Sequence, residues 1–127
     1  MDRIECFEDL VAWQKARVWV REIYAVTLRP EFGRDFGLRN QIRRAAVSVM
    51  SNTAEGYERG RPREFYHFVS VATASCAETR SHLYVAWDAG YIDPATFEHL
   101  MVQGKEIGRI LGGLRMSLRR QLKTQDG

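Results

Sequence analysis

The sequence predicts an all-α protein, built as one antiparallel up-down-up-down four-helix bundle. Apolar residues recur at steps of three and four in four long segments, which is the period of a helix with one buried face. Proline or glycine stands between consecutive segments, where a helix has to end. Connections of only a few residues favour antiparallel packing of successive helices. No strand-like alternation competes with this pattern.

The first helix is predicted over about residues 10–28. Its inward stripe comprises Trp13, Ala16, Val20, Ile23 and Thr27. Pro30 ends this helix, because proline cannot donate the next backbone hydrogen bond and disfavours helix in the residue before it. The second helix is predicted over about residues 38–58. Its inward positions are Leu38, Ile42, Ala45 or Ala46, Val49 and Thr53.

The third helix, about residues 62–89, begins at Pro62, since proline in the first helical position gives up only a donor that has no partner there. Its inward seam comprises Phe65, Phe68, Ala72, Ser75, Thr79 and His82, with Val69, Cys76 and Leu83 beside it. Asp93 and Pro94 mark the start of the fourth helix, about residues 94–122. Its apolar face comprises Phe97, Leu100, Ile107, Leu111, Leu114 and Leu118. The four helices account for a single domain over residues 1–127.

The fourth helix also carries a row of glycines at steps of four, Gly104, Gly108 and Gly112. Each glycine costs roughly 1 kcal/mol in helix propensity relative to alanine. Such a smooth groove is tolerable where another backbone approaches closely.

Composition places the chain among globular proteins, with 45% hydrophobic and 28% charged residues. No segment has the roughly 20 uncharged apolar residues that a membrane span needs, and the N-terminal residues form no apolar signal-peptide core. We therefore expect a cytoplasmic protein. Cys6 and Cys76 lie far apart in the chain without a Cys-x-x-Cys pairing, and we expect two reduced thiols.

The sequence has no nucleophile elbow, dinucleotide-binding glycine motif or phosphate-binding loop. Glu64 and His67 match one half of the Glu-x-x-His pattern of di-iron bundles, but the second half is missing, and an acid suits the first turn of a helix through the helix dipole. Glu78 and His82 are one turn apart, and a hydrogen-bonded core or interface histidine is favoured over a metal ligand there. We expect no metal, no cofactor and no enzymatic activity.

Positive charge is concentrated in two stretches of the chain. Residues 29–63 contain eight Arg and four acidic residues, and residues 105–123 contain six Lys or Arg and one acidic residue, although the net charge is only +3. The candidate nucleic-acid contacts of the first stretch are Arg39, Arg43, Arg44, Arg59, Arg61 and Arg63. The planar arginine fork binds phosphate oxygens in pairs, and Tyr57, Phe65 and Tyr66 are near enough to the turn arginines to stack on an unpaired base. The alternative is a solvated face, or ion pairs with acids of a neighbouring subunit, and residues 105–123 leave the same two possibilities open.

Several short segments resemble the four-helix bundle family of 23S rRNA intervening-sequence proteins. The segments are Phe7-Glu8-Asp9-Leu10, Trp13-Gln14-Lys15-Ala16, Gln41 to Ser48, Ser51 to Gly56, Glu64-Phe65 and Gly90-Tyr91-Ile92. They span about residues 7–120 and keep the order and spacing of the family. The signature residues are Asn52, Glu55 and Gly56, with Thr53 where the family usually has an aliphatic residue. We expect Asn52 and Glu55, near the inward-facing end of their helix, to fix a hydrogen-bond network between helices or subunits.

The resemblance implies a short cytosolic bundle that associates as a ring-like homopentamer. The accessory proteins of diversity-generating retroelements resemble the same bundle, and that likeness implies binding of reverse transcriptase and nucleic acid. Our leading hypothesis from the sequence is a non-enzymatic homo-oligomer, a pentamer, whose basic surface contacts RNA or a ribonucleoprotein. The alternative is a protein-interaction scaffold or adaptor, such as a reverse-transcriptase accessory protein.

Overall fold

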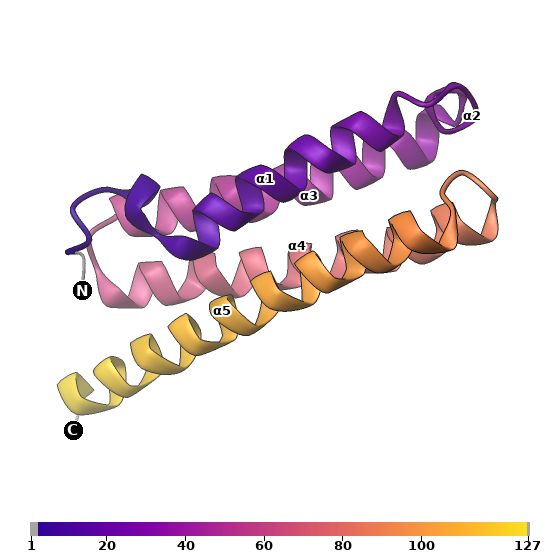
Figure 1. Ribbon diagram of the computed structural model, residues 1–127. Helices are drawn as coiled ribbons and strands as arrows, with labels where there is room; N and C mark the ends of the chain where they lie inside the picture. The colour runs from indigo at the N-terminus through magenta and orange to yellow at the C-terminus, as the bar shows by residue number, and fades with distance from the viewer. Residues whose placement is uncertain (1–2, 127) are drawn as a thin grey trace.

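The computed structural model describes residues 3–126, and its regular structure is entirely helical. Four long helices lie side by side (Figure 1): α1 (Val11–Thr27), α3 (Phe36–Glu58), α4 (Pro62–Asp88) and α5 (Pro94–Asp126). Two short elements accompany them, a 3-10 helix at Phe7–Asp9 and α2 at Pro30–Arg34. The predicted all-α class is confirmed. Residues 1, 2 and 127 of the predicted domain lie outside the described part of the chain.

The connections between the long helices lie at alternating ends of the molecule (Figure 1). α3 packs against both α1 and α4, and α5 packs against both α4 and α1. The C-terminal end of α5, yellow in Figure 1, diverges from the other helices. Over residues 3–126, none of the helices is both long and apolar enough to cross a bilayer.

Two ends of the long helices use glycine in the left-handed region. Gly60 follows α3 with a φ of +74°, and Gly90 follows α4 with a φ of +80°. A side chain is strained at such angles, so glycine is the natural residue at these helix ends. The next helices then begin at prolines, Pro62 and Pro94, in the first helical position.

The buried stripe of α1 is offset from the predicted one. Trp19 is completely buried and its indole Nε1 donates to the carbonyl oxygen of Leu100 on α5, 3.0 Å away. Trp13 and Val20, which the sequence placed inward, are only half-buried. The buried residues of α1 are Ala12, Ala16, Trp19, Ile23, Val26 and Thr27. Both stripes fit a helical period, and the volume of Trp19 determines which of them fills the space between α1 and α5.

α3 buries every position predicted to face inward, including both Ala45 and Ala46. On α4 the core lies to one side of the predicted seam, because Phe65, Phe68 and His82 are only half-buried. The buried residues of α4 are Val69, Ala72, Ser75, Cys76, Thr79, Leu83 and Ala86. The predicted apolar face of α5 is buried except at Leu114, which is half-buried.

The Pro30 segment forms a helix of its own. α2 buries Phe32 completely, and its ring stacks on that of Tyr91 with centroids 5.2 Å apart. The next residue after α2, Asp35, caps α3 by accepting from the backbone N–H of Leu38 (3.1 Å). The Tyr91 hydroxyl donates to the same carboxylate (2.9 Å), so these contacts close one end of the bundle.

Candidate nucleic-acid interface

α3 places Arg39 and Arg43 one helical turn apart, and each guanidinium lies over an aromatic ring. The Arg39 guanidinium carbon is 4.6 Å from the ring centroid of Phe36, and that of Arg43 is 4.4 Å from the ring of Tyr24 on α1. Phe36 is 61% exposed and Tyr24 is 39% exposed. Stacked arginine–aromatic pairs of this kind are flat, positively charged surfaces that suit nucleotides.

Both guanidinium groups are also anchored by hydrogen bonds. Arg39 Nη1 donates to the backbone oxygen of Gly33 (3.1 Å), and Arg43 Nε donates to the hydroxyl of Thr27 (2.8 Å). Because a guanidinium has five N–H donors, each arginine retains donors for a ligand after these bonds. The anchors hold both charges in place, which reduces the side-chain entropy lost on binding.

A polar groove of about 590 Å³ runs between α1 and α3 beside these arginines. Arg44, which is exposed, lies in the groove together with Arg43 and the signature residue Asn52. The complete lining is Tyr24, Asn40, Arg43, Arg44, Val47, Ser48, Ser51 and Asn52. No acidic side chain lines it, so the potential in the groove is positive.

Asn52 belongs to a hydrogen-bond network that joins α3 to α4. Its amide Nδ2 donates to the backbone oxygen of Ser48 (2.9 Å) and to the Ser48 hydroxyl (2.8 Å). The Ser48 hydroxyl is in turn 2.8 Å from that of Ser75 on α4. The network lies within one subunit and orients the Asn52 side chain at the edge of the groove.

The other two signature residues have different roles in the fold. Glu55 is exposed and accepts from Arg59 one turn later (3.2 Å), so it does not face inward within one subunit, and a network between subunits stays a prediction. Gly56 is buried where α3 packs against α4. A Cβ atom there would be 2.7 Å from Cβ of Phe68 and 3.0 Å from Cδ1 of Phe65, so the packing requires glycine.

The arginines of the turn between α3 and α4 have other neighbours. Arg59 pairs with Glu55 and with Glu64, 3.9 Å away, and two carboxylates therefore compensate its charge. Arg61 lies at an apolar pocket of about 750 Å³ between this turn and the C-terminal half of α5. Arg63 is exposed.

The six predicted arginines form two groups at opposite ends of α3. From Arg44 to Arg59 the helix rises about 22 Å, at 1.5 Å per residue. Figure 1 shows the first half of α3 beside α2 and the turn into α4 at the end where the N-terminus lies. The first group is Arg39, Arg43 and Arg44. Of these, Arg43 and Arg44 line the groove together with an aromatic ring and a signature residue, and Arg39 does not line it.

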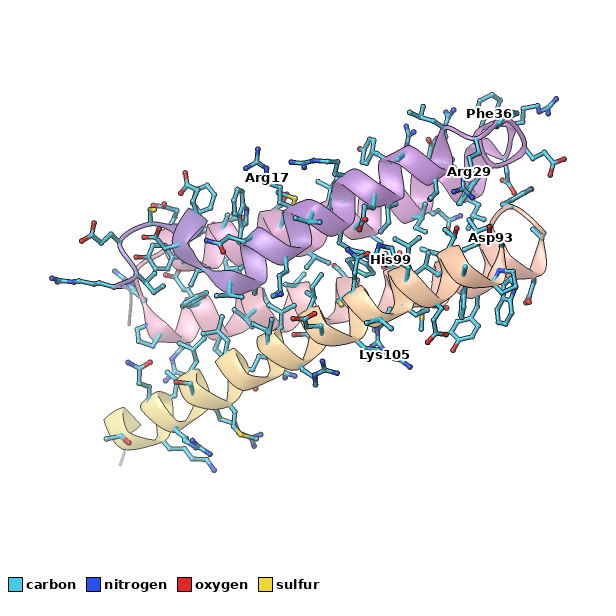
Figure 2. The ribbon with its side chains drawn as sticks, in the orientation of Figure 1. Arg17, Arg29, Phe36, Asp93, His99 and Lys105 are labelled. Carbon is cyan, nitrogen blue, oxygen red and sulfur yellow. The ribbon has the colours of Figure 1, made fainter. Side chains whose placement is uncertain are left out.

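A polar cluster that the sequence did not predict joins α1 to α5. Glu22 accepts from His99 (3.0 Å) and from the amide of Gln103, and Lys15 pairs with Glu106 at 2.8 Å. Figure 2 shows His99 on the side of α5 that faces α1. The partners are separated by more than 75 residues in sequence, so no local pattern could have revealed these pairs.

The histidines considered as metal ligands lie apart from one another. His67 is exposed and its ring packs edge-on against Phe68, and Glu64 interacts with Arg59. His82 is half-buried and hydrogen-bonds Glu78 at 3.2 Å. Over residues 3–126, no three His, Cys, Asp or Glu side chains come together as a metal site.

The two thiols are free, as expected from the sequence. Cys76 is buried, and its Sγ donates to the carbonyl oxygen of Gly104 on α5 (3.2 Å). Burial raises the pKa of the Cys76 thiol, and the nearby Arg80 opposes that shift. Cys6 is half-buried, and its pKa is raised, mainly by desolvation and secondly by the neighbouring Asp9. Neither thiol is prepared as a thiolate nucleophile.

The fold and this groove define a bundle of four long helices with a basic, aromatic-bearing face. A model of the family described as 23S rRNA-intervening sequence protein matches residues 8–113. The chain belongs to this family, as its signature segments predicted. A crystal structure of a protein of unknown function from the S23 ribosomal protein family of Bacteroides thetaiotaomicron has the same fold, with a TM-score of 0.76 at 20% identity over 83% of this chain and 98% of that one. A search of curated proteins found no match.

Proposed function

We propose that this chain is a non-enzymatic, cytoplasmic, antiparallel up-down-up-down four-helix bundle that assembles as a homo-oligomer, a pentamer. Its basic surface contacts RNA or a ribonucleoprotein. The observation that carries the proposal is the groove between α1 and α3, in which Arg43 and Arg44 lie with Tyr24 and no acidic side chain. Membership of the family described as 23S rRNA-intervening sequence protein also motivates the proposal.

Each group in the groove has a chemical role in this proposal. Arg43 and Arg44 supply N–H donors to phosphate oxygens, the contact that dominates nucleic-acid affinity. Tyr24 offers a ring that holds Arg43 on one face and supports stacking of an unpaired base at its edge. Both N–H donors of Asn52 are bonded to Ser48, which leaves its carbonyl oxygen as an acceptor for a base or a ribose hydroxyl.

Titration of the purified protein with structured RNA over a salt series tests the RNA contact. Because phosphate contacts release counterions, the logarithm of the binding constant should fall linearly with the logarithm of the salt concentration. A protein that does not bind structured RNA even at low salt would contradict the proposal.

The oligomer is tested separately by native mass spectrometry or light scattering. The chain has a mass of 14.7 kDa, and a pentamer would have five times that mass. Large apolar side chains at the surface, such as Leu28 (74% exposed) and Met116 (58% exposed), are positions that assembly would cover. A stable monomer over the working concentration range would exclude the pentamer.

The second candidate is a protein-interaction scaffold or adaptor, such as a reverse-transcriptase accessory protein. The apolar pocket between the α3–α4 turn and α5 favours it, because Leu10, Phe65, Leu114 and Leu118 surround about 750 Å³ of space. A reverse-transcriptase gene beside the gene for this chain would support the adaptor, and co-purification of the two proteins would test it.

A further inference from the structure

A second basic pocket lies on the other side of the bundle, between α4 and α5. It has a volume of about 440 Å³ and is lined by Thr73 and Arg80 of α4 and by Lys105, Gly108 and Arg109 of α5. Figure 2 shows Lys105 on the side of α5 opposite to His99, so the pocket is distinct from the polar cluster that joins α1 to α5. All three charged residues of the lining are cations.

One residue of the lining, Gly108, has no side chain. A Cβ atom at Gly108 would meet only Sγ of Cys76, at 4.0 Å, so packing within the subunit does not require glycine there. Gly104, one turn earlier, is different, because a Cβ atom there would lie 2.7 Å from Cζ2 of Trp19 and 2.9 Å from Cγ of Arg80. Gly108 therefore carries a cost in helix propensity relative to alanine that the fold of one subunit does not explain.

One neighbouring acid, Glu106, interacts with Arg109, but Lys15 is the larger cause of the lowered pKa of Glu106. Among the described residues, Arg80, Lys105 and Arg109 form no ion pair. Glu106, which follows Lys105 in the chain, is bound by Lys15 on the side facing α1, at 2.8 Å. Three cations around one cavity repel one another, and an anion between them would remove that cost.

Arg80 is positioned more firmly than a surface arginine. Its Cγ packs against the backbone at Gly104, and its Nε is buried without a hydrogen-bond partner in the described structure. The stem is thus fixed between α4 and α5 while the residue lines the cavity. The Thr73 hydroxyl donates to the backbone oxygen of Val69 (2.8 Å), so its proton is not available to a ligand and recognition has to come from the cations.

We propose that this pocket binds phosphate groups, with Arg80 and Arg109 as forked donors, Lys105 as a point charge and Gly108 as the open floor. The phosphate belongs either to a nucleic-acid backbone or to a free diphosphate. This proposal does not rest on RNA binding at the groove between α1 and α3, because the two sites share no residue.

Isothermal titration of the full chain with inorganic pyrophosphate at low salt tests the site. Wild-type protein binds pyrophosphate, and the Lys105→Gln, Arg109→Gln double variant weakens binding about tenfold or more, as expected for the loss of charged hydrogen bonds. Gly108→Leu fills the floor and abolishes binding. The controls are Arg119→Gln, Arg120→Gln, which removes two exposed charges elsewhere on α5, and Gly112→Leu, which adds the same side chain one turn beyond the pocket. Both controls bind as the wild type does, and thermal melts verify that each variant folds.

Competition between pyrophosphate and a short single-stranded RNA distinguishes the two sources. Displacement of pyrophosphate by the RNA, lost in the double variant, assigns the site to a nucleic-acid backbone. Pyrophosphate binding that RNA leaves unchanged assigns it to a free diphosphate. Absence of pyrophosphate binding, equal loss in the controls, or tighter binding of an acidic peptide than of pyrophosphate would overturn the proposal. RNA binding that the pocket variants do not affect, in a protein that does not bind pyrophosphate, would overturn this site alone and leave the proposed function standing.

Discussion

Asp35 illustrates how a single carboxylate closes one end of the bundle. It accepts from the backbone N–H of Leu38 and from the Tyr91 hydroxyl, and these two bonds, the backbone one first, lower its pKa below the ordinary value. The hydrogen bond between the Tyr91 hydroxyl and Asp35 is also the main reason why the pKa of Tyr91 is raised. Two helix ends that are far apart in sequence are thereby joined at one residue.

The lowered pKa of Asp35 predicts a specific acid dependence of stability. Because the folded pKa lies below the unfolded one, the ionised carboxylate stabilises the fold above about pH 4, and this contribution is lost as the pH falls through the folded pKa. Asp35→Asn keeps an N-cap side chain and removes the charge. Urea unfolding should show wild type more stable than this variant at neutral pH, with the difference shrinking as the pH falls toward about 2.

Tyr91→Phe provides the matched comparison, because it retains the ring that stacks on Phe32 and removes only the hydroxyl. The stability of Tyr91→Phe should still depend on pH in the acid range, but less than that of the wild type, because the hydrogen bond from the Leu38 N–H to Asp35 remains. A difference between wild type and Asp35→Asn that stays constant over the whole pH range would contradict this account.

At the scale of the helices, close packing separates glycines that look equivalent in sequence. Gly104 and Gly56 lie where a neighbouring helix leaves no space for a Cβ atom, whereas Gly112 has nothing within 4 Å of that position. A helix interior favours alanine over glycine by about 1 kcal/mol when nothing obstructs the methyl group. Where a neighbouring helix obstructs the methyl group, replacing glycine by alanine destabilises the fold instead of stabilising it.

Alanine substitutions at these glycines should therefore differ in direction. Gly104→Ala and Gly56→Ala should each lower the free energy of unfolding by about 1–3 kcal/mol through overpacking. Gly108→Ala and Gly112→Ala should raise it by about 0.5–1 kcal/mol. Chemical denaturation of the four variants measures this directly. Similar changes in the free energy of unfolding at all four positions would show that helix propensity, and not packing, determines the stability of these variants.

Helical periodicity predicted the four long helices and the buried face of α3 because each depends on local spacing alone. It chose the wrong tryptophan on α1, since Trp13 and Trp19 both fit a helical stripe and only the packing against Leu100 distinguishes them. It missed the helix at α2, because Pro30 both ends one helix and starts another, and the reason for that short helix is the distant ring of Tyr91.

At the scale of the whole molecule, the two basic sites lie on separate surfaces. One is the groove between α1 and α3 with Arg43 and Arg44, and the other is the pocket between α4 and α5 with Lys105 and Arg109. The sequence could identify the arginines of α3 and the basic stretch of α5. It could not show that carboxylates bind Arg59, or that Arg80 joins the residues of α5, because both depend on contacts between helices.

The central claim is that RNA binds through the groove between α1 and α3, and its most direct test compares salt dependence between variants. The Arg43→Gln, Arg44→Gln double variant should bind structured RNA more weakly and with a salt slope reduced by about 2, because two phosphate contacts are lost. Arg119→Gln, Arg120→Gln removes the same charge from exposed positions of α5 and should leave the slope unchanged. Equal reductions in the two double variants would contradict the claim, since binding would then follow net charge and not the groove.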